Sequence, residues 1–195
     1  MSKTVEFFFD VGSPTSYLAW TQLPQIAAQA NAQILWRPML LGGVFKATGN
    51  QSPVSIAAKG RYMLQDLARF ASRYRVPMAF NPHFPINTLT LMRGAAGYLD
   101  TDQFQPYVKA IFTALWAQQK HLGMPEVVAE VLVGAGLDPA EFERLVNDEA
   151  VKQRLKDNTE EAVKRGVFGA PTFFVGNEMH FGQDRLDFVA EALAR

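Results

Sequence analysis

Residues 4–14 read Thr-Val-Glu-Phe-Phe-Phe-Asp-Val-Gly-Ser-Pro, and this stretch decides the fold. The run from Thr4 to Asp10 is rich in β-forming residues with an unbroken aromatic centre, which predicts a strand buried on both faces in the middle of a sheet. Ser13 is a favoured N-cap and Pro14 a favoured first helical residue, so we expect a helix from there to about residue 30. A second short strand is expected over 33–37, ended by Pro38.

The rest of the chain changes character twice. Gly42-Gly43, Gly49-Asn50 and Ser52-Pro53 predict a loop-rich stretch. Helical patterns then predict helices near 56–74, 88–99, 103–121, 125–135, from 139, and from 147 or 149 to 165. Residues 172–175 and 178–181 predict two strands joined by a tight turn at Gly176-Asn177, and Asp184 is expected to cap a last helix over 185–194.

The order of these elements predicts an α/β fold. A β-α-β unit comes first, a helical block follows, and a β-β-α unit ends the chain. Because the outer pieces can share one sheet, we expect residues 1–38 and 166–195 to form one domain and residues 39–165 to form a helical domain inserted into it. Loops at the edge of such a sheet are where sites usually form.

Composition excludes several classes of function. The chain has 195 residues, with 19 basic and 19 acidic residues, so its formal net charge is zero. A neutral chain gives no argument for a nucleic-acid or membrane partner. Cysteine is absent, which excludes disulfides and thiol redox chemistry of the protein's own. The three histidines lie far apart, so no metal site is expected. The first ten residues do not form a signal peptide, and we expect a cytoplasmic protein.

Four segments, in order, resemble one known family. Residues 9–17, Phe-Asp-Val-Gly-Ser-Pro-Thr-Ser-Tyr, resemble the start of 2-hydroxychromene-2-carboxylate isomerases and the related kappa-class glutathione transferases. The other three segments are Gly49-Asn50, residues 59–67, and Phe168-Gly-Ala-Pro-Thr-Phe173 with Phe181-Gly-Gln-Asp-Arg185. The resemblance implies a DsbA-like thioredoxin fold with a helical insertion, glutathione as cofactor, and a homodimer.

The first motif suggests how a cofactor thiol could be activated. The N-terminus of a helix presents free N–H groups and a positive dipole end, and a hydroxyl there can donate a hydrogen bond to a thiolate. The resemblance gives this role to Ser13, with Pro14 and Thr15 beside it. The simpler alternative is that Ser13 only caps the helix; a hydroxyl can accept the capping bond and donate to a thiolate at once.

The resemblance assigns further glutathione contacts near the C-terminus. It implies that the Ala170–Pro171 peptide is cis and that the backbone of Ala170 pairs with the peptide part of glutathione. It also implies that Gln183 and Asp184 hold the γ-glutamyl end, although kappa members usually have Ser where Gln183 stands. The alternatives are a proline that begins a strand and a carboxylate that caps a helix.

The substrate contacts are predicted less sharply. The resemblance assigns Asn50 to glutathione or substrate, and Lys46, Lys59, Asn87 and Arg93 are candidates for binding a substrate carboxylate. The alternative for Asn50 is a turn residue, and the simpler explanation of the other four is an ordinary surface residue. The expected reaction is isomerisation of an aromatic unsaturated keto acid by thiolate addition, bond rotation and elimination. The alternatives are a kappa-like glutathione transferase and a non-catalytic protein that binds glutathione or a small acid.

Overall fold

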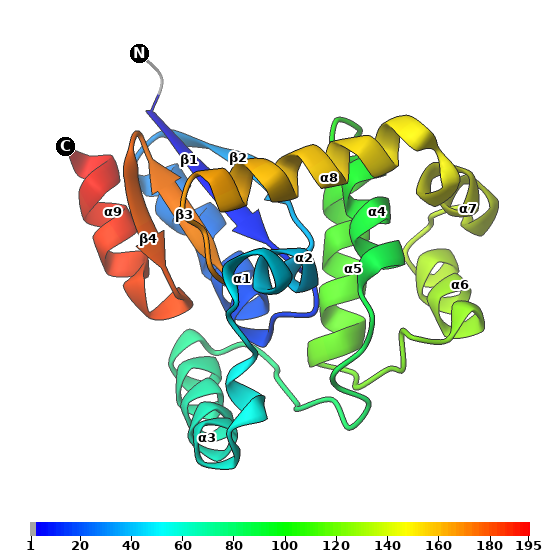
Figure 1. The fold of residues 1–195 in the computed structure, drawn as a ribbon, viewed down its shortest axis with the longest axis horizontal. Helices are drawn as coiled ribbons and strands as arrows, with labels where there is room; N and C mark the ends of the chain where they lie inside the picture. The colour runs from blue at the N-terminus through cyan, green and yellow to red at the C-terminus, as the bar shows by residue number, and fades with distance from the viewer. Residues whose placement is uncertain (1–2) are drawn as a thin grey trace.

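A computed structural model describes residues 3–195, which contain a four-stranded sheet on one side of the molecule and a group of helices on the other (Figure 1). The strands are β1 (Lys3–Phe9), β2 (Ala32–Pro38), β3 (Thr172–Val175) and β4 (Glu178–Phe181), in the order β2-β1-β3-β4. β1 pairs in parallel with β2 and antiparallel with β3, and β3 pairs antiparallel with β4. Both ends of the chain therefore build one sheet, and the α/β class expected from the sequence is confirmed.

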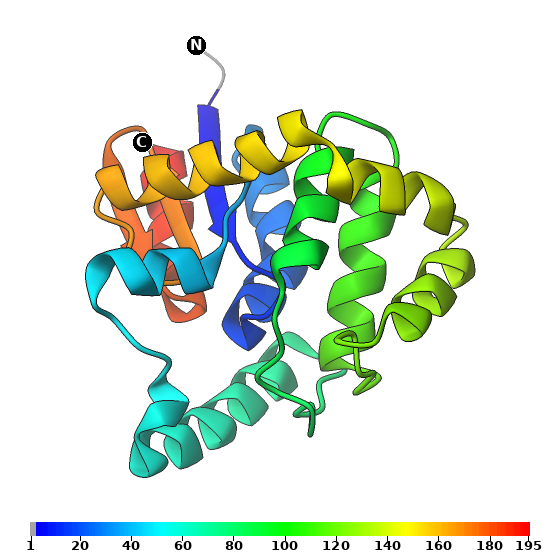
Figure 2. The same cartoon turned by 45° about the vertical axis from the view of Figure 1, so that its right-hand side comes forward.

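Helices supply the rest of the described chain. They are α1 (Pro14–Gln29), α2 (Leu41–Thr48), α3 (Ala57–Tyr74), α4 (Leu89–Tyr98), α5 (Phe104–Trp116), α6 (Pro125–Gly134), α7 (Pro139–Asn147), α8 (Glu149–Lys164) and α9 (Leu186–Ala194), with short 3-10 turns at Pro53–Ser55 (η1) and Gln183–Arg185 (η2). Figures 1 and 2 show α4 to α7 grouped beside the sheet, α8 running back toward it, and α3 at the opposite side of the molecule from α8.

Alternate side chains of β1 belong to two different clusters. Phe7 and Phe9 pack with α1, α5 and α9 in the larger core cluster, whereas Phe8 packs with Val44 of α2 and Ala162 of α8. All three phenylalanines are fully buried, which confirms the prediction of a strand covered on both faces. The polar turn that follows β1 is thereby held at a fixed edge of the sheet, where α1 begins.

The structure corrects three expectations about the elements. Residues 41–48, expected as loop, form α2; Gly43 allows close packing there, since a Cβ on it would lie 3.1 Å from the Thr159 side chain. The helix expected over 103–121 ends at Trp116. Asp184 does not cap the last helix, because it lies inside η2 and pairs with Arg185, while α9 begins without a side-chain cap.

Residues 3–195 contain neither a membrane-spanning helix nor a cluster of metal-binding side chains. None of the helices there has the length and apolar character needed to cross a membrane. Within the same residues, no three histidine, aspartate or glutamate side chains come close enough together to hold a metal ion.

Candidate functional site

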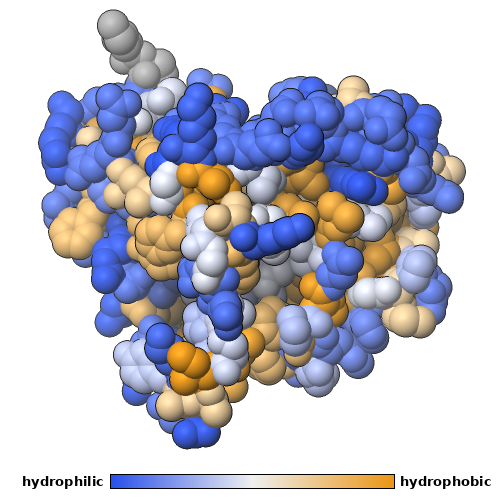
Figure 3. Space-filling model, in the orientation of Figure 1, coloured by the Kyte–Doolittle hydropathy of each residue, from blue (hydrophilic) through white to orange (hydrophobic). Residues whose placement is uncertain are grey.

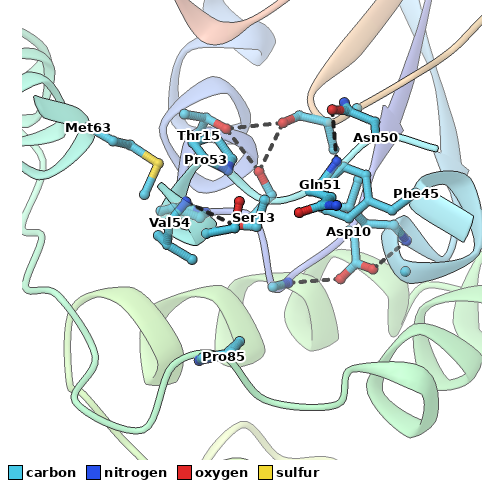
Figure 4. Close-up of a pocket in the computed structure, with 18 of the residues that line it drawn as sticks. Asp10, Ser13, Thr15, Phe45, Asn50, Gln51, Pro53, Val54, Met63 and Pro85 are labelled. Carbon is cyan, nitrogen blue, oxygen red and sulfur yellow. Dashed lines mark hydrogen bonds between the residues drawn. The ribbon is translucent and has the colours of Figure 1, made fainter. Parts of the chain in front are cut away.

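A cavity of about 1070 Å³ lies at the N-terminus of α1. Its walls come from α1, α2, η1 and α3, from residues 84–88, and from the turns at 168–170 and 181–184. Figure 4 shows Ser13 and Thr15 at the end of α1, with Met63 of α3 and Pro85 of the 84–88 segment approaching from other sides. Figure 3 shows a hydrophilic band over α8 and apolar residues gathered below it, toward α3.

Two hydroxyl groups and one carbonyl form a cluster at the helix end. The Oγ of Ser13 lies 2.9 Å from the Oγ1 of Thr15, and each lies 3.1 Å from the carbonyl oxygen of Ala170. Ser13 also caps α1, since its Oγ accepts a hydrogen bond from the N–H of Ser16. Ser13 is nearly buried, whereas Thr15 is half-exposed, so the threonine is the more accessible of the two hydroxyls.

The backbone of Ala170 has a hydrogen-bonded carbonyl and an N–H group without a partner among residues 3–195. The Ala170–Pro171 peptide is cis, which confirms that expectation. The Ala170 carbonyl accepts hydrogen bonds from the two hydroxyls at the N-terminus of α1, so it is not free for the pairing with a peptide that the resemblance implies. Its N–H donates to no acceptor among residues 3–195. Pro171 itself does not line the cavity, and its carbonyl accepts the N–H of Gly182.

A turn after β4 carries the second polar wall. Gly182 adopts a φ of 100°, and a Cβ there would approach the Asp184 carboxylate to 2.4 Å, so the turn requires glycine. Gln183 and Asp184 follow directly and both line the cavity. Gln183 is buried, and Asp184 pairs with the guanidinium of Arg185.

Three of the five residues predicted to contact the substrate line the cavity, and two do not. Asn50 lines the cavity, and its amide nitrogen donates to the Phe168 carbonyl at 2.8 Å. Asn87 also lines it and accepts the N–H of Leu89. Lys59 is the single cationic side chain among the cavity-lining residues of the described chain. Lys46 is exposed elsewhere on α2, and Arg93 lines a separate cavity between α2 and α8.

Sequence reasoning missed two residues of this site. Asp10 lines the cavity and is 1% exposed; its carboxylate accepts hydrogen bonds from the N–H groups of Gly12 and Leu41 and from the Thr88 hydroxyl. Burial raises the pKa of Asp10 above its usual value, and the three hydrogen bonds offset this only in part. The sequence does indicate Asp10, as a carboxylate at the end of an aromatic strand. It gives no indication of Tyr74, the second missed residue, which contacts Gln183.

Comparison with known proteins adds to this geometry. A family model described as a DSBA-like thioredoxin domain matches residues 4–194. The chain is 33% identical to the 2-hydroxychromene-2-carboxylate isomerase of Sphingobium xenophagum over 203 residues, which cover 99% of each chain. The chain belongs to the 2-hydroxychromene-2-carboxylate isomerase family of DSBA-like thioredoxin domains. It is also 28% identical to glutathione S-transferase kappa 1 of Rattus norvegicus, over 98% of this chain and 91% of that one.

Solved structures agree with this family. A structure of 2-hydroxychromene-2-carboxylate isomerase superposes with a TM-score of 0.84 at 32% identity, covering 98% of this chain and 95% of that one. DsbA of Pseudomonas aeruginosa superposes with a TM-score of 0.61 at 18% identity, over 99% of this chain and 82% of that one. The second likeness concerns the fold alone.

Proposed function

We propose that this chain is a glutathione-dependent isomerase of a small aromatic unsaturated keto acid, of the 2-hydroxychromene-2-carboxylate type. The observation that carries the proposal is the Ser13–Thr15–Ala170 cluster at the N-terminus of α1, inside a large cavity of a chain without cysteine. The relatives named as isomerases support the reaction class, and the relatives named as kappa transferases support glutathione.

The residues of the cavity fit glutathione. The N-terminus of α1 and two hydroxyls suit a thiolate, because helix-end N–H groups and O–H donors favour negative charge. The free N–H of Ala170 suits a peptide carbonyl. Gln183 and Asp184 offer an amide and a carboxylate for the charged end of the tripeptide. The volume, about 1070 Å³, leaves room for a second small molecule.

When bound, glutathione supplies a sulfur nucleophile whose addition to a conjugated carbon makes a double bond rotatable and whose departure restores it. Ser13 and Thr15 each have one hydroxyl proton to donate. One hydroxyl keeps its hydrogen bond to the Ala170 carbonyl, and the other can turn and donate to the thiolate. A hydrogen bond to a charged group contributes about 1.5–3 kcal/mol, which lowers a thiol pKa by about one to two units. The helix end adds to this effect.

In this proposal, Lys59 binds the carboxylate of the substrate through its ammonium group. It is the one cation of the described cavity lining, and the apolar side chains of Met63 and Phe84 line the same cavity and suit an aromatic ring. An ammonium group there also stabilises negative charge that develops on the substrate when a nucleophile adds to it.

The decisive experiment follows the fate of glutathione. Wild-type protein is supplied with 2-hydroxychromene-2-carboxylate, with and without glutathione, and the products are separated by chromatography. We expect isomerisation only with glutathione, whose amount stays constant over many turnovers. A conjugate that accumulates would instead indicate a kappa-like transferase, and binding without turnover would indicate a binding protein. Isomerisation at the full rate without glutathione overturns the proposal.

Two matched pairs of variants test the assigned roles. Ser13→Ala is expected to lower kcat about tenfold to a hundredfold while glutathione still binds. Ser16→Ala is its control, because the Ser16 hydroxyl is buried without a partner among the described residues. Lys59→Met is expected to raise KM for the substrate, whereas Lys46→Met on the exposed part of α2 leaves it unchanged. Equal effects within either pair contradict the assignment.

A further inference from the structure

Tyr74 contacts the buried glutamine of the cavity wall. It is the last residue of α3, and its Oη lies 2.9 Å from the side-chain oxygen Oε1 of Gln183 and 3.2 Å from the Gln183 carbonyl oxygen. Gln183 is 3% exposed and lines the cavity. The helix that forms one wall of the cavity is thereby joined to the turn that forms another.

The hydrogen bond decides which end of the amide faces the cavity. A tyrosine hydroxyl has one proton, and its donation to Oε1 at the shorter distance occupies the amide oxygen. The amide NH2 group donates to no acceptor among residues 3–195, and Gln183 lines the cavity, so both of its N–H donors are available to a ligand. An NH2 group has two donors and no acceptor, so it suits a carboxylate and disfavours an ammonium group.

We propose that Tyr74 is a positioning residue that holds the amide of Gln183 with its NH2 group directed into the cavity, where it binds a carboxylate of the ligand. The inference rests on the proposed function, since the ligand is taken to be glutathione. Asp184, the next residue, offers the opposite preference and suits the ammonium group. Without the Tyr74 hydroxyl the amide turns freely, and its oxygen faces the carboxylate part of the time.

The state of the phenol supports this role. Burial raises the pKa of Tyr74 above its ordinary value of 10.0, and the charges of Asp184 and Asp187 add to this while Arg73 opposes it. The hydroxyl therefore keeps its proton and acts as a donor at neutral pH. The ring packs against Phe70, with 5.7 Å between the ring centroids. Tyr74→Phe keeps this packing and removes only the hydrogen bond.

Binding calorimetry with three tripeptides tests the proposal. The probes are glutathione, an analogue that lacks the γ-glutamyl carboxylate, and an analogue that lacks the γ-glutamyl amine. Tyr74→Phe is expected to weaken glutathione and the amine-free analogue by about fivefold each, and the carboxylate-free analogue by less than twofold. Tyr62→Phe on the same helix is the control, because Tyr62 is 61% exposed, and it is expected to change nothing.

A second variant guards against a purely structural effect. Gln183→Met removes the amide, and the double variant with Tyr74→Phe is expected to bind glutathione no more weakly than Gln183→Met alone, because both changes remove one contact. Equal loss for all three tripeptides, additive losses in the double variant, or no loss overturns this inference alone. Failure of the wild type to bind glutathione overturns the proposed function and this inference together.

Discussion

Two carboxylates four residues apart, Glu6 in β1 and Asp10 just after it, are held in opposite ways. Glu6 accepts hydrogen bonds from Arg165 at 2.8 and 3.0 Å and from Arg37 at 3.0 Å. Burial alone would raise the pKa of Glu6, but these two guanidinium groups outweigh it, and the pKa lies below its ordinary value of 4.5. Asp10 has only neutral donors, and its pKa is raised. The partly buried carboxylate of Glu6 has cationic partners, whereas the fully buried carboxylate of Asp10 has none among the described residues.

This difference separates a stabilising end of the sheet from the end that carries the candidate site. At the Glu6 end, Arg165 also lies over the Phe174 ring at 3.7 Å, and the cluster joins β1 and β2 to the end of α8. At the Asp10 end, the carboxylate joins the turn before α1, the start of α2 and the Thr88 segment, three parts of the cavity wall. A costly buried group is retained where it fixes the geometry around Ser13.

The largest effect is expected at Asp10. Asp10→Ala leaves the N–H groups of Gly12 and Leu41 and the Thr88 hydroxyl without their acceptor, and we expect a loss of about 3 kcal/mol in the free energy of unfolding. Urea denaturation followed by circular dichroism measures it. A loss below about 1 kcal/mol would show that solvent or other groups replace the carboxylate, and that it does not hold the cavity wall together.

The two carboxylates are also expected to give opposite pH dependence. Glu6→Gln should cost about 2 kcal/mol near neutral pH. Because the folded pKa of Glu6 is lowered, its contribution is present above pH 4.5 and is lost as the pH falls through the folded value. The pKa of Asp10 is raised, so the part of its contribution that depends on its proton is present below pH 3.8 and is lost as the pH rises through the folded value.

Unfolding free energies of wild type, Glu6→Gln and Asp10→Asn between pH 3 and pH 7 compare these slopes. As the pH rises, the unfolding free energy of the wild type should increase relative to that of Glu6→Gln. Over the same interval it should decrease relative to that of Asp10→Asn. Slopes of the same sign would contradict the contrast between the two ends of the sheet.

Much of the fold could be predicted because local signals and packing agree. The aromatic run of β1, the Ser13-Pro14 helix start and the helix that begins at residue 139 all appear where the sequence indicates them. The helix α2 could not be predicted from the sequence, because Gly42 and Gly43 are poor helix formers. Contacts from distant parts of the chain favour this helix instead: the Asp10 carboxylate accepts the N–H of Leu41, and Thr159 packs against Gly43.

Some residues of the candidate site could likewise be predicted from local motifs, and others could not. Ser13, Ala170 and Gln183 belong to recognisable motifs, and the structure brings all three to one cavity. Asp10 contacts Leu41, 31 positions away, and Tyr74 contacts Gln183, 109 positions away, and no local pattern reveals these two pairs. The lysines were interchangeable in the sequence, and only the position of α3 against the cavity distinguishes Lys59 from Lys46.

The smallest effect is expected at Thr88, which tests whether the neutral donors around Asp10 act singly or together. Thr88→Val removes one donor and keeps the shape, so we expect a loss of about 1 kcal/mol by urea denaturation. In the Asp10→Ala background the same change should cost almost nothing, because the hydroxyl no longer has the carboxylate to bind. If the two losses add instead, the Thr88 hydroxyl stabilises the protein independently of Asp10, and the carboxylate is held by the N–H groups of Gly12 and Leu41 alone.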